Sequence, residues 1–330
     1  MLHGTSFLFT FWHICVILYL IILLSVIILG AGHIGIHTSG GRKVFAERNY
    51  KMNTYLLIDG HNLLFQMFFG MPARIVSKAG IPIQGVMGFV GAFIKICRLT
   101  SPTRIGVIFD SEHKNPRHEL DINYKANRPS YADLPDEENP FSQLPYIYSA
   151  LNYMKISHAE ATDCETDDVI AAFTRKYGSH SKVIISSHDS DFFQLVTNNV
   201  SILRYRGKNS VICDKAYIKE RFGILPSKYA DFKALTGDRS DNIKGADRVG
   251  PKTAALLLSK YGSLDNIIAN SAQIAKPSIR KSIRESADRL KINQKLITLD
   301  GNAALPFQIH PLKTDPTSYK TRQVLNAIGL

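Results

Sequence analysis

The sequence predicts an α/β fold built on a parallel sheet and followed by a helical domain. Three short apolar runs rich in Ile and Val, at residues 55–59, 105–110 and 182–191, are flanked by turn residues, as buried parallel strands are. Helical patterns such as "VMGFVGAFIKICRL" and "ETDDVIAAFTRKYG" lie between them, and this alternation favours an open α/β sheet. After Pro226 the pattern changes to successive helices around a turn that contains Gly245 and Gly250.

The composition is that of a globular protein with a basic surface. At 330 residues and 45% hydrophobic content, the chain can bury one large core or two domains of ordinary size. The formal net charge of +12 suggests a polyanionic partner. The four cysteines, at positions 15, 97, 164 and 213, lie far apart and form no C-x-x-C pair, so they indicate neither a disulfide scaffold nor a zinc site. We expect a protein of the reducing cytoplasm.

Residues 1–51 differ in composition from the rest of the chain. Residues 7–30 carry no charge and are long enough to span a bilayer, and the basic residues after them would keep the following chain on the cytoplasmic side. In a second interpretation, translation starts at Met52 and residues 1–51 are conceptual translation of upstream DNA. The abrupt change in composition favours the second interpretation. We expect contact with a membrane only if this segment is translated, and we divide the chain into residues 1–51, 52–225 and 226–330.

Each of the three predicted strands has one or two acids at its carboxyl end. Asp59 and Asp110 end the first two apolar runs, and Asp189 and Asp191 end the third. In open α/β sheets, ligands bind at this edge. Alternatively, each Asp has only a structural role, as an ordinary cap or turn residue.

A further group of acids precedes the apolar part of the helix predicted after residue 162. Thr162 or Asp163 can cap this helix, with Glu165 in its first turn. Glu165 and Asp168 are three residues apart and share a face, whereas Asp167 is displaced by one position. Capping explains one or two of these acids, but not all four.

The acids together predict a metal centre. With the pair in "TGDRSDN", nine carboxylates would gather near one edge and repel each other unless cations lay among them. Carboxylate oxygens without His or Cys suit Mg²⁺ or Mn²⁺. Two such ions about 4 Å apart are the usual device for phosphodiester hydrolysis, one activating the attacking water and one stabilising the leaving oxygen.

Two basic segments accompany the acids. Residues 111–145 form a long, polar, proline-containing segment with Lys, Arg and Tyr side chains, which favours a functional loop over a disordered insert. The turn before Pro251 joins main-chain N–H groups to Lys244, Arg248 and Lys252, an arrangement suited to phosphate.

The motifs resemble, in order, those of the bacterial 5′→3′ exonuclease and flap endonuclease family, which includes the N-terminal nuclease domain of DNA polymerase I. They are "IDGHNLLFQMFF", "VIFDSEHKNPRHELDINYKANRP", "ETDDVIA", "SSHDSDFFQLV" and "YADFKALTGDRSDNIKGADRVGPKTAALLL", and they extend from about Tyr55 to about Asp300. The resemblance implies a stand-alone PIN-like nuclease domain with a helical arch, followed by a helix-hairpin-helix domain.

The resemblance also implies a role for each matching residue. The ligands of the first metal would be Asp59, Asp110, Glu165, Asp167 and Asp168, and those of the second Asp189, Asp191, Asp238 and Asp241, with Asp167 or Asp168 near both. Catalysis would also use Lys125 and Arg128 of the arch, where Arg117 and Arg128 would steer phosphates and Tyr124 would stack on a base. Duplex DNA would contact Lys244, Arg248, Gly250, Lys252 and Thr253.

The resemblance further implies a K⁺ ion held by main-chain carbonyls of the hairpin. The matching positions are Leu235, Thr236, Lys244, Ala246 and Val249. The family usually has a glycine where this chain has Arg248, and arginine is disfavoured at that position if it requires a positive φ.

The function expected from the sequence is that of a Mg²⁺- or Mn²⁺-dependent 5′ nuclease that cuts DNA at 5′ ends and flaps. We expect a nucleoid-associated monomer that needs no small-molecule cofactor. A non-catalytic protein that binds DNA junctions is one alternative. An RNase of the wider PIN group is another, which the "TGDRSDN…VGPKTA" element disfavours because it suits duplex DNA.

Overall fold

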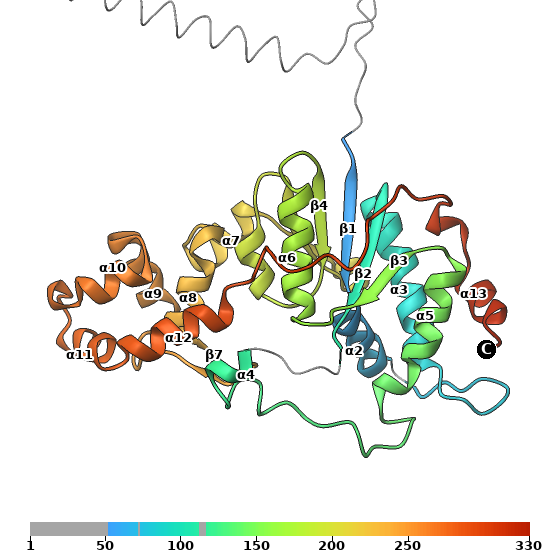
Figure 1. Ribbon diagram of the computed structural model, residues 1–330, viewed down its shortest axis with the longest axis horizontal. Helices are drawn as coiled ribbons and strands as arrows, with labels where there is room; N and C mark the ends of the chain where they lie inside the picture. Colours follow the sequence, from blue (N-terminus) through green and yellow to red (C-terminus); the bar gives the residue numbers. More distant parts are fainter. Residues whose placement is uncertain (1–51, 72, 112–116) are drawn as a thin grey trace, which may run out of the picture. The chain divides into compact units, whose positions relative to one another are not determined.

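The centre of the computed structural model, which describes residues 52–71, 73–111 and 117–330, is a six-stranded sheet (Figure 1). The strand order is β3-β2-β1-β4-β5-β6, and all neighbours pair in parallel except β5 and β6. The strands are β1 (Thr54–Asp59), β2 (Arg104–Phe109), β3 (Ser157–Glu160), β4 (Lys182–Ser186), β5 (Val200–Arg204) and β6 (Val211–Cys213). The predicted parallel sheet is therefore confirmed.

Both faces of the sheet are buried. Along β1, Tyr55 and Leu57 belong to one hydrophobic cluster and Leu56 and Ile58 to another, because successive side chains of a strand point to opposite faces. Burial on both faces accounts for the apolar runs in the sequence.

Helices cover the two faces (Figure 1). One hydrophobic cluster joins the face of Leu56 to four helices. These are α2 (Gly60–Gly70), α3 (Gln84–Thr100), α5 (Leu144–Tyr153) and α13 (Thr321–Ala327). The other face packs against α6 (Thr166–Tyr177), and that cluster continues into the helical domain without a break.

The helical domain follows the sheet in the chain. Its helices are α7 (Lys215–Phe222), α8 (Tyr229–Thr236), α9 (Pro251–Tyr261), α10 (Leu264–Ala269), α11 (Pro277–Glu285) and α12 (Ala287–Ile297). Between α8 and α9 lies a small hairpin of β7 (Gly237–Asp238) and β8 (Ile243–Lys244). The helix, turn, helix and short helix predicted after Pro226 are confirmed.

Some elements were not predicted. Strand β3 has the sequence "SHAE" and is only partly buried, so it lacks the apolar run that marks the central strands. In the described part of the segment predicted to form the arch, residues 111 and 117–145, the chain holds the short helix α4 (Arg117–Leu120), then turns, a 3₁₀ turn at Pro140–Gln143 and the start of α5. The 3₁₀ turns are Pro140–Gln143, η2 (Asp191–Leu195), Gly207–Asn209, Pro226–Lys228, Ser271–Gln273 and Pro316–Ser318.

The apolar run at residues 7–30 lies outside the described residues, so the structure does not test the prediction of a bilayer span there. Within the part of the chain that the structure describes, no helix is both long and apolar enough to cross a membrane.

Candidate active site

Acidic side chains meet at the carboxyl edge of the sheet, as predicted. Asp59 is the last residue of β1, Asp110 follows β2, and Asp189 and Asp191 follow β4. Because β1 pairs with both β2 and β4, the ends of these three strands are neighbours.

Asp59 is buried, and two neighbouring groups hold its carboxylate in place. Its Oδ1 accepts a hydrogen bond from the Asn62 N–H (3.0 Å), so it caps α2, and its Oδ2 accepts one from Ser187 Oγ (2.9 Å). Burial, followed by the charge of Asp110, raises the pKa of Asp59 to about 7. This carboxyl therefore favours a bound proton or a neighbouring cation.

Asp110 connects the sheet to the start of α6. Its Oδ1 accepts a hydrogen bond from the Thr166 N–H (2.9 Å), and its own N–H donates to His61 Nδ1 (2.9 Å). Burial raises the pKa of Asp110, but His61 and the Thr166 N–H lower it more, so it lies below its ordinary value.

The predicted cap of α6 was wrong. The helix begins at Thr166 with Glu165 as the N-cap residue, rather than with Thr162 or Asp163, and the Glu165 side chain makes no capping hydrogen bond. The distant Asp110 supplies that hydrogen bond to the first turn instead, which leaves the Glu165 carboxylate available for Arg117 and Lys125.

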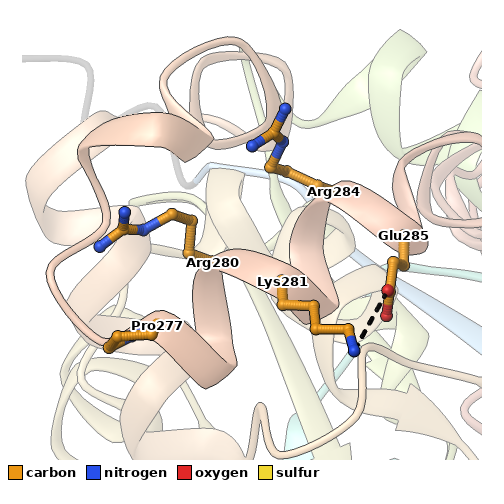
Figure 2. Close-up of a pocket in the computed structure, with 5 residues that line it drawn as sticks. All are labelled: Pro277, Arg280, Lys281, Arg284 and Glu285. Carbon is orange, nitrogen blue, oxygen red and sulfur yellow. Dashed lines mark ion pairs between the residues drawn. The ribbon is translucent and has the colours of Figure 1, made fainter.

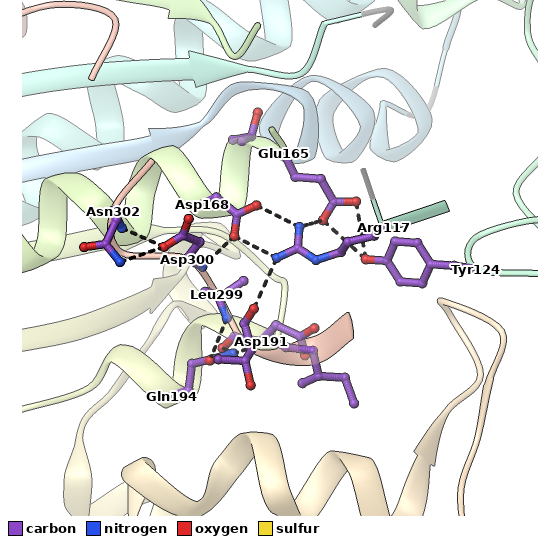
Figure 3. Close-up of polar contacts among 12 residues, drawn as sticks. Arg117, Tyr124, Glu165, Asp168, Asp191, Gln194, Leu299, Asp300 and Asn302 are labelled. Carbon is purple, nitrogen blue, oxygen red and sulfur yellow. Dashed lines mark hydrogen bonds and ion pairs between the residues drawn. The ribbon is translucent and has the colours of Figure 1, made fainter. Parts of the chain in front are cut away.

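The acids of α6 point in two directions. Glu165 and Asp168 share a face, as predicted, and both contact Arg117 (Figure 3). Asp167 is displaced by one position, and burial, followed by the charges of Asp189 and Asp59, raises its pKa well above the ordinary value.

A second acidic group joins the end of β4 to the hairpin. Asp191, Asp238 and Asp241 each offer one carboxylate oxygen, and these oxygens lie within 4.8 Å of one another. Among the described residues, the five acids assigned to the first metal form no comparable group. Asp189, which the resemblance places with this second set, accepts a hydrogen bond from the Asp191 N–H (2.8 Å) and contributes to the raised pKa of both Asp191 and Asp59.

Lys233 on α8 was missed by the sequence reasoning. Its buried ammonium pairs with both Asp191 and Asp238. Burial and Asp189 raise the pKa of Asp191 to about 7 although Lys233 opposes the rise. Burial also raises the pKa of Asp238, but Lys233 outweighs it and the pKa lies below the ordinary value. A lone lysine in an apolar helix was the available signal.

Lys125 and Arg128 lie beside these acids. The Lys125 N–H donates to the Asp241 carbonyl (3.0 Å), and its ammonium pairs with Glu165. Lys125 has a φ of +58°, an uncommon conformation for a residue other than glycine. Arg128 Nη2 lies 2.9 Å from Asp241 Oδ1, and its side chain is half exposed.

Arg117 and Tyr124 are buried, although the resemblance implies that Arg117 steers phosphates and that Tyr124 stacks on a base. The guanidinium of Arg117 is bound by Glu165 and Asp168, and the Tyr124 hydroxyl lies 3.3 Å from both Glu165 oxygens. Both residues therefore support Glu165, and neither offers a surface to a phosphate or a base.

The residues predicted to contact DNA lie in the hairpin and around the start of α9. Lys244, Arg248 and Lys252 are exposed, Gly250 is the N-cap residue, and Thr253 lies in the first turn. Arg248 has a φ of +64°, so the position does require the left-handed region that glycine prefers.

The carbonyls proposed for K⁺ already accept hydrogen bonds at three positions. The Leu235 carbonyl accepts from the Ala246 N–H (2.9 Å), Ala246 from the Val249 N–H (3.2 Å), and Lys244 from Asn293 Nδ2 (2.9 Å). Thr236 and Val249 complete the predicted set.

A basic pocket lies away from the acids, on α11 (Figure 2). Its volume is about 320 Å³, and Pro277, Arg280, Lys281, Arg284 and Glu285 line it. Arg280 Nε donates to the Ile274 carbonyl (2.9 Å), and Lys281 pairs with Glu285 (3.7 Å).

Comparisons with known proteins identify the family and agree with the fold. Two family models match, the 5′-3′ exonuclease N-terminal resolvase-like domain over residues 54–223 and the 5′-3′ exonuclease C-terminal SAM fold over residues 224–320. A 5′-3′ exonuclease of Aquifex aeolicus is 32% identical over 282 residues, which cover 84% of this chain and 93% of that protein. The thermostable DNA polymerase I of Thermus thermophilus is 32% identical over 243 residues, which cover 73% of this chain and 28% of the polymerase.

The fold is similar to a solved structure of a bacteriophage T5 flap endonuclease in a pseudo-enzyme-product complex with DNA and metal ions. The TM-score is 0.62 at 21% identity, and the match covers 84% of this chain and 94% of that chain. The matches confirm a resolvase-like, PIN-like domain followed by a helical domain.

Proposed function

Since the chain belongs to the 5′-3′ exonuclease family, we propose that it is a metal-dependent nuclease that cuts DNA at 5′ ends and 5′ flaps. The observation that supports this most directly is the convergence of carboxylates from three strand ends, α6 and the hairpin on one edge of the sheet. The chain spans about a quarter of its DNA polymerase I relatives, so we carry over from them only a nuclease role in replication and repair.

The donor set fits a divalent cation. Asp191, Asp238 and Asp241 supply only carboxylate oxygens, the ligands that Mg²⁺ and Mn²⁺ prefer. The raised pKa values of Asp59 and Asp191 support the same assignment, because burial and neighbouring acids raise both, and a nearby cation would favour the charged carboxylates. We propose that another ion, the first metal of the sequence prediction, is held by Asp59, Asp110, Glu165 and Asp167. Such ions activate the attacking water and offset the charge of the leaving oxygen.

We propose that two basic side chains, Lys125 and Arg128, offset the negative charge of the substrate phosphate. Lys125 and Arg128 lie beside Glu165 and Asp241, where their positive charges would attract the scissile phosphate and stabilise it as its charge grows. The exposed Arg128 would meet the phosphate first, and the buried Lys125 would hold its position through Glu165 and the Asp241 carbonyl.

Duplex DNA would lie along the hairpin. Lys244, Arg248 and Lys252 are exposed beside the first turn of α9, whose N–H groups suit a phosphate. A K⁺ ion at this hairpin stays a prediction. The Lys244 carbonyl accepts a hydrogen bond from Asn293 Nδ2 and the Gly245 carbonyl accepts one from Arg289 Nη2, both at 2.9 Å, and a carbonyl oxygen has a second lone pair that a cation can use.

A cleavage assay tests this proposal. Purified protein is incubated with 5′-flap DNA in Mg²⁺ or EDTA, and product lengths are read on a sequencing gel. We expect Mg²⁺-dependent cutting at the flap junction or stepwise release of nucleotides. Asp191→Asn should slow cutting by more than about a hundredfold, beyond the usual effect of losing an outer-shell partner, while DNA binding persists. Glu220→Gln, the same change at an exposed acid of α7, is the control and should cut normally.

The outcomes separate the alternatives. DNA binding without cutting, even in Mn²⁺, would favour a junction-binding protein. Faster cutting of an RNA flap than of a DNA flap would favour an RNase. Full activity of Asp191→Asn would contradict the assignment of the metal site.

A further inference from the structure

Residues 297–302, which we name the C-terminal strap, contact both halves of the acidic centre (Figure 3). On one side, Gln194 of η2 donates through Nε2 to the Ile297 carbonyl (3.0 Å) and accepts through Oε1 from the Leu299 N–H (3.1 Å). On the other side, the Asp300 N–H donates to Asp168 Oδ1 (2.7 Å). The strap therefore joins the turn after β4 to the first turn of α6.

Both oxygens of Asp168 are engaged in this network. Arg117 donates to them as a fork, with Nη1 at 2.8 Å from Oδ2 and Nη2 at 2.7 Å from Oδ1, while the Asp300 N–H adds a third bond. The Asp168 side chain is buried, so these bonds form away from water. Bidentate pairs of this kind are strong and fix the orientation of both partners.

The neighbouring Asp167 has different surroundings. Consecutive residues of a helix lie about 100° apart around its axis, so Asp167 and Asp168 point in different directions. Asp168 faces Arg117, whereas the charges of Asp189 and Asp59 act on Asp167. The two adjacent acids therefore have different neighbours.

Arg117 also holds the side chain of Glu165. Its Nη1 also donates to Glu165 Oε2 (2.8 Å), and its Nη2 donates to the Thr298 carbonyl of the strap (3.3 Å). The other Glu165 oxygen pairs with Lys125. A displacement of Arg117 would therefore move Glu165, and with it the ammonium of Lys125.

Helix α12 extends the same network to the hairpin. Near its start, Arg289 donates to the Gly245 carbonyl (2.9 Å) and Asn293 to the Lys244 carbonyl (2.9 Å). The helix then runs into the strap at Thr298. One helix thus connects the hairpin to Arg117.

We propose that Asp168 is a positioning residue rather than a metal ligand. Together with the strap, Asp168 fixes Arg117, and Arg117 holds Glu165 at the proposed metal site. This inference rests on the proposed function and changes one member of the ligand set that the family resemblance implies. It also makes the end of α12 part of the active site's support.

Counting bound Mn²⁺ tests the assignment with the same substitution at two adjacent positions. We expect Asp168→Asn to bind as many Mn²⁺ ions as the wild-type protein, by calorimetry or electron paramagnetic resonance, but to cleave flap DNA about 10- to 100-fold more slowly. Asp167→Asn, the matched control, should bind fewer ions. Loss of an ion in Asp168→Asn, or cleavage by it at the wild-type rate, would overturn the proposal.

A second pair of variants tests the contact itself. Arg117→Met leaves the buried Asp168 carboxylate without its main partner and should lower the melting temperature, and adding Asp168→Asn should raise it again. A double variant that melts no higher than Arg117→Met would contradict the pairing. If Asp168→Asn alone does not fold, the ion count is made on the double variant.

The ion counts and the melting temperatures do not depend on DNA cleavage. A wild-type protein that binds Mn²⁺ but cuts no DNA would refute the proposed function, while the comparison of Asp167 with Asp168 would still decide the role of Asp168. A wild-type protein that binds no Mn²⁺ would refute both.

Discussion

Buried carboxyl groups give the sheet edge a marked pH dependence at the scale of single residues. The pKa of Asp59 and that of Asp191 are both raised to about 7, mainly by burial. Each carboxyl binds its proton more tightly in the folded protein than in the unfolded chain, where its pKa is about 4. The folded protein therefore takes up protons between about pH 4 and pH 7, and the free energy of unfolding falls as pH rises through this window.

We expect the melting temperature in EDTA to fall as the pH rises from about 5 to about 8. Asp59→Asn removes one of the carboxyl groups with a raised pKa and should make this fall shallower. Mg²⁺ should restore more stability at high pH than at low pH, because protons compete with the metal for the carboxylates. The lowered pKa of His188 acts in the opposite direction, but it is common to both proteins and cancels in the comparison. Parallel curves for the two proteins would show that Asp59 does not titrate in this range.

At the scale of elements, the hairpin between α8 and α9 depends on two glycines. A Cβ atom on Gly245 would lie 2.4 Å from the Gly237 nitrogen and 2.5 Å from the Leu235 carbonyl oxygen, and both are backbone atoms that cannot move aside alone. Gly237 also has a φ of +79°. The close approach keeps the end of α8 against β8 and sets the position of the turn that leads to α9.

Gly245→Ala should therefore open the hairpin and destabilise the protein by about 1–3 kcal/mol, the usual effect of overpacking. Denaturant titration would show this as a lower midpoint with an unchanged slope. Gly70→Ala is the matched control, because a Cβ there meets nothing within 4 Å and α2 ends at this residue. Equal midpoints for the two variants would mean that the hairpin relaxes without cost.

At the scale of the whole molecule, an acidic centre lies within a basic chain. The formal net charge is +12, yet the carboxylates gather at one edge of the sheet, beside Lys125, Arg128 and Lys233. The excess positive charge would attract DNA, and release of counterions makes such binding weaken as salt increases.

We expect the affinity for flap DNA to fall steeply with salt concentration. Lys252→Ala, at the first turn of α9, should reduce the slope of log K against log[salt] by about 1, the contribution of one phosphate contact. Lys182→Ala is the control, since this exposed lysine begins β4 at the sheet edge opposite the acids. A slope unchanged in Lys252→Ala would place the duplex elsewhere, and the basic side chains of α11 would be the next surface to test.

The sequence by itself determined the central strands, the acids at their ends and the helical domain, because each is a local pattern. An apolar run of strand length followed by Asp59 or Asp110 can be read from a few neighbouring residues. The tertiary structure decided which charges meet. Arg117 binds Asp168 across 51 positions and Lys233 binds Asp191 across 42, and no local pattern specifies such partners. The start of α6 was misplaced for the same physical reason, since its capping oxygen comes from Asp110, 56 residues away in the chain.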